Sequence, residues 1–138
     1  MTLIVDSFAW VEFLTGGRWG SEVRTRLESS GELVSPEIVL AEIARLFARE
    51  GRDSGEIRGH LRSILALSSV RPVDVDISLE VPAADRDLRR SARARGLGPP
   101  SFADAIILAF ARTLDAQVLT RDSHFEGMSE TDWVGAER

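Results

Sequence analysis

Four carboxylates stand where the chain passes from apolar to polar sequence: Asp6, Glu42, Asp104 and Asp122. An ionised carboxylate beside a core is costly to bury unless it is paired or coordinated, and like charges held close together repel. A divalent cation would neutralise such a group. Mg²⁺ accepts a few carboxylates and keeps several waters, and one or two such ions can orient a phosphodiester and activate water to attack it. The pattern therefore predicts metal-dependent phosphodiester chemistry.

Each of these acids also has an ordinary structural explanation, because 22 of the 138 residues are acidic, about one in six. Asp6 could simply cap the helix that follows it. Glu42 could form an ion pair with Arg45 or Arg49, worth about 0.3–0.5 kcal/mol on a helix surface. Its position is at the margin of a core face that four apolar residues mark: Val39, Ile43, Leu46 and Phe47.

Asp104 and Asp122 have equally ordinary alternatives. Asp104 lies three residues after Ser101, so the two could form a capping box at the start of a helix. Asp122, two residues beyond Thr120, could be a turn-forming aspartate. If all four acids had only such roles, the chain would be a non-catalytic protein-interaction module, and Mg²⁺ would leave its thermal stability unchanged.

The composition limits which metals and partners the chain can have. It has no cysteine and only two histidines, His60 and His124, which excludes thiolate zinc sites and leaves oxygen ligands for Mg²⁺, Mn²⁺ or Ca²⁺. A net charge of −5 and a pI near 5.1 argue against a broad basic face for nucleic acid. Because we find no long apolar run and no signal peptide, we expect one cytoplasmic domain, residues 1–138.

Alternating apolar segments indicate the elements that would position the acids. Strands are predicted at 2–6, 33–34, 70–75, 117–120 and 132–134, the first of them buried and the last at an edge of the sheet. Helices are predicted at 7–14, 19–28, 36–50, 53–67, 76–95 and from 101 onward. Ser35 and Pro36 are expected to supply an N-cap and a first-turn proline, and Pro82 to start or kink its helix. Strands separated by helices predict an α/β fold with a mostly parallel sheet covered on both faces. Ligands bind at the carboxyl ends of such strands, where Asp6 and Asp122 are expected.

Four segments together resemble the PIN-domain family, especially its VapC-type toxins, in order and spacing over nearly the whole chain. They are Leu-Ile-Val-Asp-Ser at 3–7, Leu-Ala-Glu-Ile-Ala-Arg-Leu at 40–46, Ser-Phe-Ala-Asp-Ala-Ile-Ile at 101–107 and Val-Leu-Thr-Arg-Asp-Ser-His-Phe at 118–125. The last two motifs are the most specific.

The resemblance implies a PIN-like three-layer fold and an endoribonuclease that uses Mg²⁺ or Mn²⁺. It also implies that the catalytic and metal-binding residues are Asp6, Glu42, Asp104 and Asp122. Thr120 matches a hydroxyl position that orients one of the metal-binding acids, as outer groups of metal sites commonly do. The implied partners are an RNA substrate, an antitoxin protein of a type II toxin–antitoxin pair and a second copy of the chain.

Several further residues have a functional and a structural interpretation. Four apolar residues could form a surface that contacts a partner, although a place in the core is the favoured interpretation. They are Trp10, Phe13, Trp19 and Val23. Four arginines at helical spacing could contact RNA phosphates, although the favoured interpretation is that they form a solvent-exposed face of their helix. They are Arg86, Arg89, Arg90 and Arg93. His124 adjoins the predicted site, and a role as general base depends on geometry. Glu126 receives no role.

Other enzyme classes fit the sequence less well. A phosphatase of the haloacid dehalogenase kind needs a second aspartate two residues after the first, and position 8 is Phe. A P-loop enzyme is excluded because the chain has no lysine. A housekeeping RNA-processing nuclease would have the same site as a toxin, and only a neighbouring antitoxin gene would distinguish the two.

Overall fold

A single parallel sheet forms the centre of the molecule in the computed structural model, which describes residues 1–135. The strand order is β3-β2-β1-β4-β5, and each neighbouring pair is parallel. The strands are β1 (Thr2–Val5), β2 (Glu32–Pro36), β3 (Ser69–Arg71), β4 (Gln117–Thr120) and β5 (Thr131–Trp133). The predicted α/β class is confirmed.

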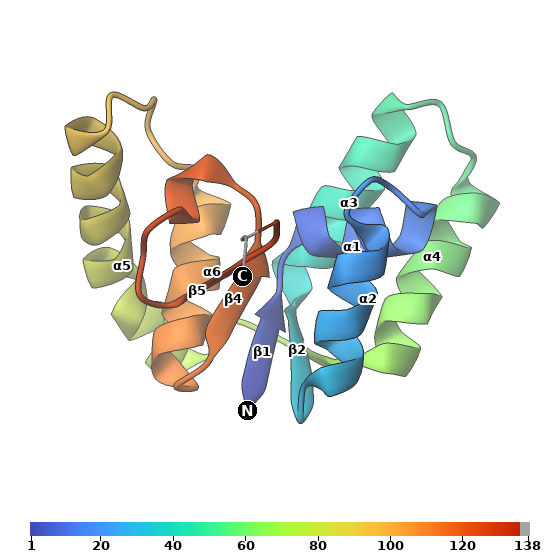
Figure 1. The fold of residues 1–138 in the computed structure, drawn as a ribbon, viewed down its shortest axis with the longest axis horizontal. Helices are drawn as coiled ribbons and strands as arrows, with labels where there is room; N and C mark the ends of the chain where they lie inside the picture. Colours follow the sequence, from blue (N-terminus) through green and yellow to red (C-terminus); the bar gives the residue numbers. More distant parts are fainter. Residues whose placement is uncertain (136–138) are drawn as a thin grey trace.

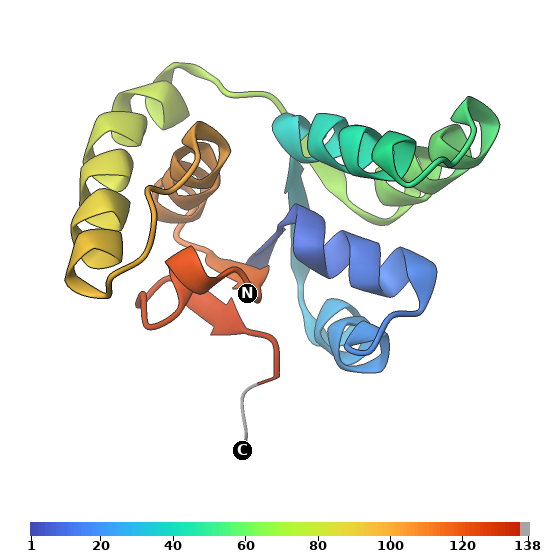
Figure 2. The same ribbon diagram turned by 90° about the horizontal axis from the view of Figure 1, so that it is seen from above.

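Helices cover both faces of this sheet. They are α1 (Ser7–Thr15), α2 (Gly20–Ser29), α3 (Glu37–Arg49), α4 (Ser54–Leu67), α5 (Val75–Ala94) and α6 (Phe102–Thr113), with a short 3₁₀ helix η1 (Ser123–Phe125). Helices α1–α4 lie on one side and α5 and α6 on the other (Figures 1 and 2). The three layers match the predicted architecture. Among residues 1–135, none of the helices combines the length and the continuous apolar character that a membrane-spanning helix needs.

The strand order reverses between β1 and β4. The chain builds outward from β1 through β2 to β3, and then returns to place β4 on the other side of β1. The connecting helices change faces at the same point, which leaves a crevice outside the carboxyl ends of β1 and β4. Asp6 directly follows β1, and Asp122 comes two residues after β4 ends. The topology therefore brings these two acids to one place.

The core explains why the central elements form where they do. In β1, the run Leu3-Ile4-Val5 is buried, as expected for a strand covered on both faces. In α6, every residue from Ala105 to Ala111 is buried, which confirms that this helix is packed on all sides. Trp10 and Val23 are fully buried, whereas Phe13 and Trp19 are partly buried against the core. The core interpretation of these apolar residues is confirmed.

The predicted helix start at Ser35-Pro36 was wrong. Both residues belong to β2, and α3 begins at Glu37 without a side-chain cap. Ser35 is buried instead, where its Oγ accepts a hydrogen bond from Trp10 Nε1 (2.9 Å) and lies 2.7 Å from Ser68 Oγ. Serine thus satisfies the indole N–H inside the core, a tertiary contact that outweighs its preference for helix caps.

Three smaller predictions also need correction. Leu46 is 39% exposed and does not belong to the core face of α3, which consists of Val39, Ile43 and Phe47. The third strand ends at Arg71, just before Pro72, because proline has no N–H for the sheet. Of the two roles predicted for Pro82, starting the helix is excluded, because α5 already begins at Val75 and Pro82 lies inside it.

Candidate metal centre

Asp6 is buried at the carboxyl end of β1, where it serves two elements at once. Its Oδ1 accepts the backbone N–H of Ala9 (3.2 Å), so it does cap α1. Its Oδ2 accepts the hydroxyl of Thr120 (2.5 Å) on the neighbouring strand β4. The register pairs Val5 with Leu119, which places Asp6 beside Thr120. Capping and participation in the site are therefore compatible.

Thr120 connects two of the predicted acids. Its fully buried hydroxyl donates to Asp6 and accepts the backbone N–H of Asp122 (3.0 Å). One hydroxyl group can do both because it has one donor and two acceptor positions. The end of β1 and the turn after β4 are thereby fixed relative to each other.

Asp104 reaches the same edge of the sheet from α6, which lies on the face of the sheet opposite to α1–α4 (Figure 2). Helix α6 precedes β4 by three residues and runs back along it, so the first turn of α6 lies near the carboxyl ends of the strands. Ser101 and Asp104 form the predicted capping box, with Asp104 N donating to Ser101 Oγ (3.1 Å) and Ser101 N donating to Asp104 Oδ2 (3.0 Å). The capping box holds the carboxylate in place at the helix start.

Glu42 has a buried oxygen without a hydrogen-bond partner. Among residues 1–135, its Oε1 is buried and unpaired, and no ion pair joins Glu42 to Arg45 or Arg49. Burial raises the pKa of Glu42 and the charge of Arg45 opposes that rise, but the two side chains form no direct ion pair, so the surface ion-pair interpretation leaves Oε1 unexplained. A buried acceptor without a donor is rare in proteins and points to a missing ligand, ion or water.

The electrostatics place Asp122 within reach of the charges of the other three acids, and Glu42 within reach of Asp104 as well. Burial raises the pKa of Asp6 to about 7, with a further contribution from the charge of Asp122, although the Thr120 and Ala9 hydrogen bonds oppose it. Burial, followed by the charge of Asp104, raises the pKa of Glu42. The pKa of Asp104 is raised by burial and by Asp122, against its bond with Ser101. For Asp6, Glu42 and Asp104, burial and neighbouring negative charge therefore outweigh the favourable contacts, which for Glu42 include the charge of Arg45 and for Asp104 that of His124.

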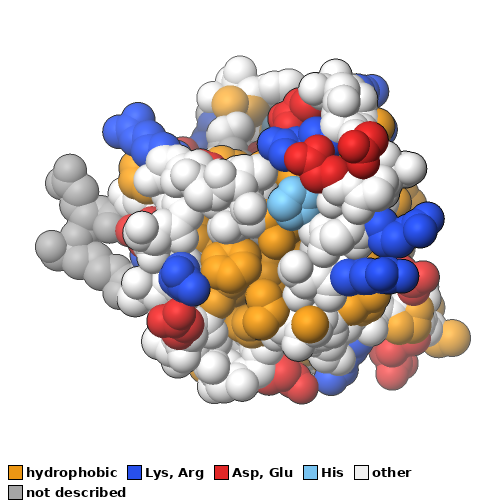
Figure 3. Space-filling view, turned by 90° about the vertical axis from the view of Figure 1, so that its right-hand side faces the viewer, with side chains coloured by type: hydrophobic (Ala, Val, Ile, Leu, Met, Phe, Trp, Pro, Cys, Tyr) orange, Lys and Arg blue, Asp and Glu red, His pale blue; other side chains and the backbone are white. Residues whose placement is uncertain are grey.

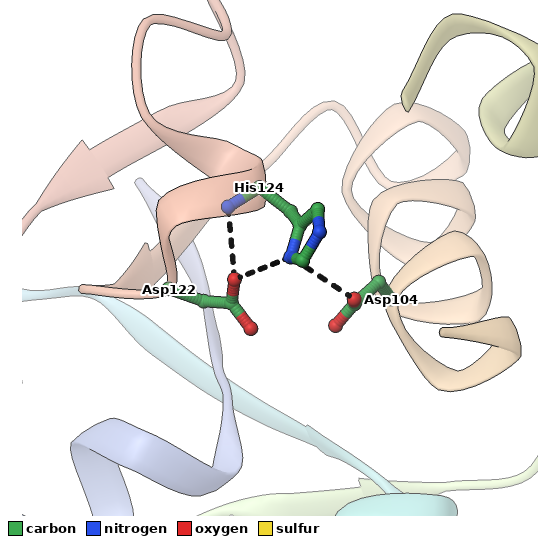
Figure 4. A group of neighbouring side chains, drawn as sticks. All are labelled: Asp104, Asp122 and His124. Carbon is green, nitrogen blue, oxygen red and sulfur yellow. Dashed lines mark hydrogen bonds and ion pairs between the residues drawn. The ribbon is translucent and has the colours of Figure 1, made fainter. Parts of the chain in front are cut away.

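His124 lies between two of the acids (Figure 4). Oδ1 of Asp122 accepts the backbone N–H of His124 (2.9 Å), and the Nδ1 atom of the ring is 3.0 Å from the same oxygen. The second ring nitrogen, Nε2, lies 3.0 Å from the carbonyl of Gly98. Asp104 Oδ2 is 3.9 Å from Nδ1. Burial opposes the charged ring, but Gly98 and Asp122 outweigh it and raise the pKa of His124.

The loop before α6 and the end of α5 hold the η1 turn that carries His124. Arg95 donates to the carbonyls of Ser123 (2.7 Å) and Glu126 (3.1 Å), and it also pairs with the carboxylate of Glu126. These contacts and that of Gly98 join segments 26 to 31 residues apart. The sequence does not mark Arg95, Gly98 or Glu126 as parts of the site, because no local pattern indicates a contact over such a distance.

The assembled group fits a hard divalent cation. All four predicted acids lie at one edge of the sheet, and their carboxylate oxygens are the ligands that Mg²⁺ and Mn²⁺ accept. The unpaired Oε1 of Glu42 and the raised pKa values of three acids are what a site prepared for positive charge would show. Among the residues described, Asp104, Asp122 and His124 also lie close enough together to share one ion.

The chain is similar in sequence to known proteins. The PIN domain family model matches residues 3–130. A ribosome assembly protein of Schizosaccharomyces pombe is 30% identical over 83 residues, which are 60% of this chain but only 8% of that protein, so the chain matches a small part of that relative.

Solved structures share the fold over nearly the full length. A toxin–antitoxin complex from Klebsiella pneumoniae has a TM-score of 0.68 at 20% identity, with 94% of each chain covered. VapBC2 from Rickettsia felis has a TM-score of 0.69 at 15% identity, with 95% of this chain and 96% of that chain covered. The Mycobacterium tuberculosis toxin VapC20, described as cleaving the sarcin-ricin loop, has a TM-score of 0.63 at 20% identity over 83% of this chain and 85% of that one. The family match covers most of the chain and the fold agrees with it, so this protein belongs to the PIN-domain family.

Proposed function

We propose that this protein is an endoribonuclease that cuts RNA phosphodiester bonds with the help of Mg²⁺ or Mn²⁺. The metal-binding and catalytic residues would be Asp6, Glu42, Asp104 and Asp122. The observation that carries the proposal is the buried, unpaired Oε1 of Glu42, a residue whose pKa is raised by burial and by the charges of Asp104 and Asp122. Without a cation, this arrangement leaves negative charge poorly compensated at the one edge of the sheet where ligands bind.

Each residue has a distinct part in the proposed site. Asp6 is held by Thr120 and Asp104 by Ser101, so both carboxylates keep one orientation as a phosphodiester approaches. Glu42 reaches the site from the opposite layer to Asp104 and offers the oxygen that has no other partner. A bound divalent cation would lower the pKa of a coordinated water and stabilise charge on the attacking and leaving oxygens. An acidic protein can therefore act on RNA, because the positive charge at the site comes from the metal.

We further propose that the chain is a single-domain toxin that acts in the cytoplasm and is neutralised by an antitoxin. The support comes from structures described as toxin–antitoxin complexes, which share this fold. Hydrophobic side chains also gather in a hollow on the face of the molecule that Figure 3 shows. Two grooves with apolar lining lie on the half formed by α1–α4, and their apolar lining residues are Leu40, Ile57, Leu61 and Leu65 in one and Phe13, Leu27, Leu33 and Leu67 in the other. An antitoxin segment or a second copy of the chain would cover such surfaces.

The decisive test of the nuclease is cleavage of purified total RNA. The isolated wild-type protein is incubated with RNA in Mn²⁺ or Mg²⁺ and, separately, in a chelator. The Asp104→Asn variant is incubated with RNA in the same metals. A matched control is Asp115→Asn, which makes the same change at an exposed turn where φ is 50°, a conformation that asparagine tolerates. We expect discrete cuts with metal for the wild type and Asp115→Asn alone, and end mapping would identify the substrate.

Two results would contradict the proposal. Intact RNA under all conditions, with a correctly folded wild type, would favour a protein-interaction module instead. Cuts that persist in the chelator or in Asp104→Asn would mean that a contaminating nuclease or another site is responsible. The toxin assignment has a separate test: co-expression with a small reading frame next to the gene should yield a complex in which RNA cleavage is suppressed.

A further inference from the structure

His124 brings a nitrogen atom to a site whose other candidate ligands are carboxylate oxygens. Its ring extends from η1 toward both Asp122 and Asp104 (Figure 4). Nδ1 lies 3.0 Å from Oδ1 of Asp122 and 3.9 Å from Oδ2 of Asp104. The three residues can offer ligand atoms that all lie within 4.8 Å of one another. A single ion could contact all three.

The Gly98 carbonyl determines which ring nitrogen is available to a cation. A carbonyl oxygen only accepts hydrogen bonds, so Nε2, 3.0 Å away, carries the proton. In the neutral ring the lone pair is then on Nδ1, which faces the two aspartates. Histidines that bind metals commonly fix their tautomer in this way, by donating the second N–H to a backbone carbonyl.

The distances around Nδ1 match those between ligands of one ion. Nδ1 with its lone pair and Oδ1 of Asp122 are both acceptors, so a proton or a metal ion must lie between or beside them for the contact to be favourable. In an octahedron with bonds of about 2.1 Å, neighbouring ligands are about 3.0 Å apart and opposite ligands about 4.2 Å. The separations of 3.0 and 3.9 Å from Asp122 and Asp104 fall within these limits.

We propose that Nδ1 of His124 is a ligand of the divalent cation held by Asp104 and Asp122, and that this nitrogen makes the site prefer Mn²⁺ to Mg²⁺. The inference rests on the proposed metal-dependent function and adds a ligand and a preference to it. Mg²⁺ favours oxygen ligands and retains its waters, whereas imidazole suits divalent transition metals. The unpaired Oε1 of Glu42 is independent evidence that the site is prepared for a cation.

Pulsed electron paramagnetic resonance of bound Mn²⁺ tests the nitrogen ligand directly. We expect a hyperfine coupling to ¹⁴N in the wild-type complex that is absent in His124→Gln. The matched control is His60→Gln, because the His60 ring packs against Phe47 and is the only other histidine in the sequence. The coupling should persist in His60→Gln. The wild-type spectrum is informative even if His124→Gln folds poorly.

Calorimetric titration with Mn²⁺ and Mg²⁺ tests the preference. We expect His124→Gln to lose about tenfold or more in Mn²⁺ affinity and clearly less in Mg²⁺ affinity. Bound Mn²⁺ without nitrogen coupling, at a site that Asp104→Asn abolishes, would overturn the inference and leave the proposed nuclease intact. An equal loss for both metals would overturn the preference. If Mn²⁺ does not bind at all, the metal-dependent function fails as well.

Discussion

The side chain of Thr120 fixes the relative positions of two proposed metal ligands, Asp6 and Asp122. Its hydroxyl donates to Asp6 and accepts from the backbone of Asp122, and it is completely buried. The backbone N–H of Asp6 also bonds to the carbonyl of Leu119 (3.5 Å), but among the described hydrogen bonds the Thr120 hydroxyl is the group that contacts both Asp6 and Asp122. A valine of the same shape would keep the packing and remove both interactions.

We therefore expect Thr120→Val to lower the free energy of unfolding by about 1–3 kcal/mol, because a buried N–H and a buried carboxylate lose their partner. Metal affinity should fall about 10–100-fold, as it does when groups that orient ligands are removed. Thr120→Ser, which keeps the hydroxyl, should restore most of both quantities. Urea unfolding and Mn²⁺ titration measure them. Unchanged metal binding in Thr120→Val would mean that the hydroxyl does not position the site.

Asp6 should make the metal-free protein less stable as the pH rises. Its pKa in the folded state is raised by burial from 3.8 to about 7, so the folded protein holds a proton that the unfolded chain has already released. The stability that this proton contributes is fully present below pH 4 and is lost as the pH rises through about 7. Asp6→Asn has no such proton to lose.

The comparison that isolates this effect is the difference in free energy of unfolding between the wild type and Asp6→Asn, measured in a chelator. We expect the wild type to lose stability relative to Asp6→Asn between pH 4 and 8. Taking the difference removes the contribution of other titrating groups that both proteins share. A difference that does not change with pH would show that Asp6 is already ionised in the folded, metal-free protein.

At the scale of secondary-structure elements, the start of α6 has both a structural and a functional task. The capping box of Ser101 and Asp104 satisfies backbone N–H groups that the helix leaves free, and the same bonds orient a proposed metal ligand. Ser101→Ala should lower the free energy of unfolding by about 1 kcal/mol, the usual effect of losing a cap. Metal affinity should fall as well, because Asp104 loses the backbone geometry that holds it.

Ser63→Ala is the matched control for this prediction. Ser63 lies inside α4 and is half-buried, and its hydroxyl forms a solvent-exposed hydrogen bond to the carbonyl of Gly59 in the preceding turn. Its change in the free energy of unfolding should stay within about 0.5 kcal/mol. If Ser101→Ala and Ser63→Ala behaved alike in urea unfolding, the capping box would contribute no stability to α6.

Local patterns predicted most elements because each pattern carries its own physical cause. The Ser101–Asp104 spacing predicted the start of α6, and its apolar run predicted a helix buried on every side. Ser35 was assigned wrongly for the same reason: its neighbour Pro36 suggests a helix start, whereas its actual partner, the indole of Trp10, is 25 residues away. Local rules cannot anticipate a tertiary hydrogen bond that satisfies a buried group.

The site was predictable in outline at the scale of the whole molecule. Alternating strands and helices imply a parallel sheet, and a parallel sheet collects its ligands at one edge, which is why Asp6 and Asp122 could be placed together. The unpaired oxygen of Glu42 depends on how α3 packs at the edge of the sheet, and the contact of His124 with Gly98 depends on how η1 packs against the end of α5 and the loop before α6. These contacts form only when the elements pack together, so the spacing of residues along the sequence could not predict them.

The last prediction concerns this meeting of layers. Glu42 comes from α3 on one side of the sheet and Asp104 from α6 on the other, so a cation bound by both would link the two layers of the folded protein. The unfolded chain offers no such arrangement, and binding therefore stabilises the native state. At a metal concentration 100 times the dissociation constant, the gain is about 2.7 kcal/mol, which would raise the melting temperature of a domain of this size by about 10 °C.

Thermal unfolding with and without Mn²⁺ or Mg²⁺ measures this stabilisation, with NaCl added to equalise ionic strength because salt alone would screen the repelling carboxylates. We expect the full increase in the wild type and in Asp115→Asn, a smaller one in Glu42→Gln, and none in Asp104→Asn. Glu42→Gln without metal should be at least as stable as the wild type, since it removes a repelling charge whose pKa is already raised by burial. Equal melting temperatures in metal and in chelator for the wild type would mean that the acids serve only as caps and turns, and that the two layers hold together without a cation.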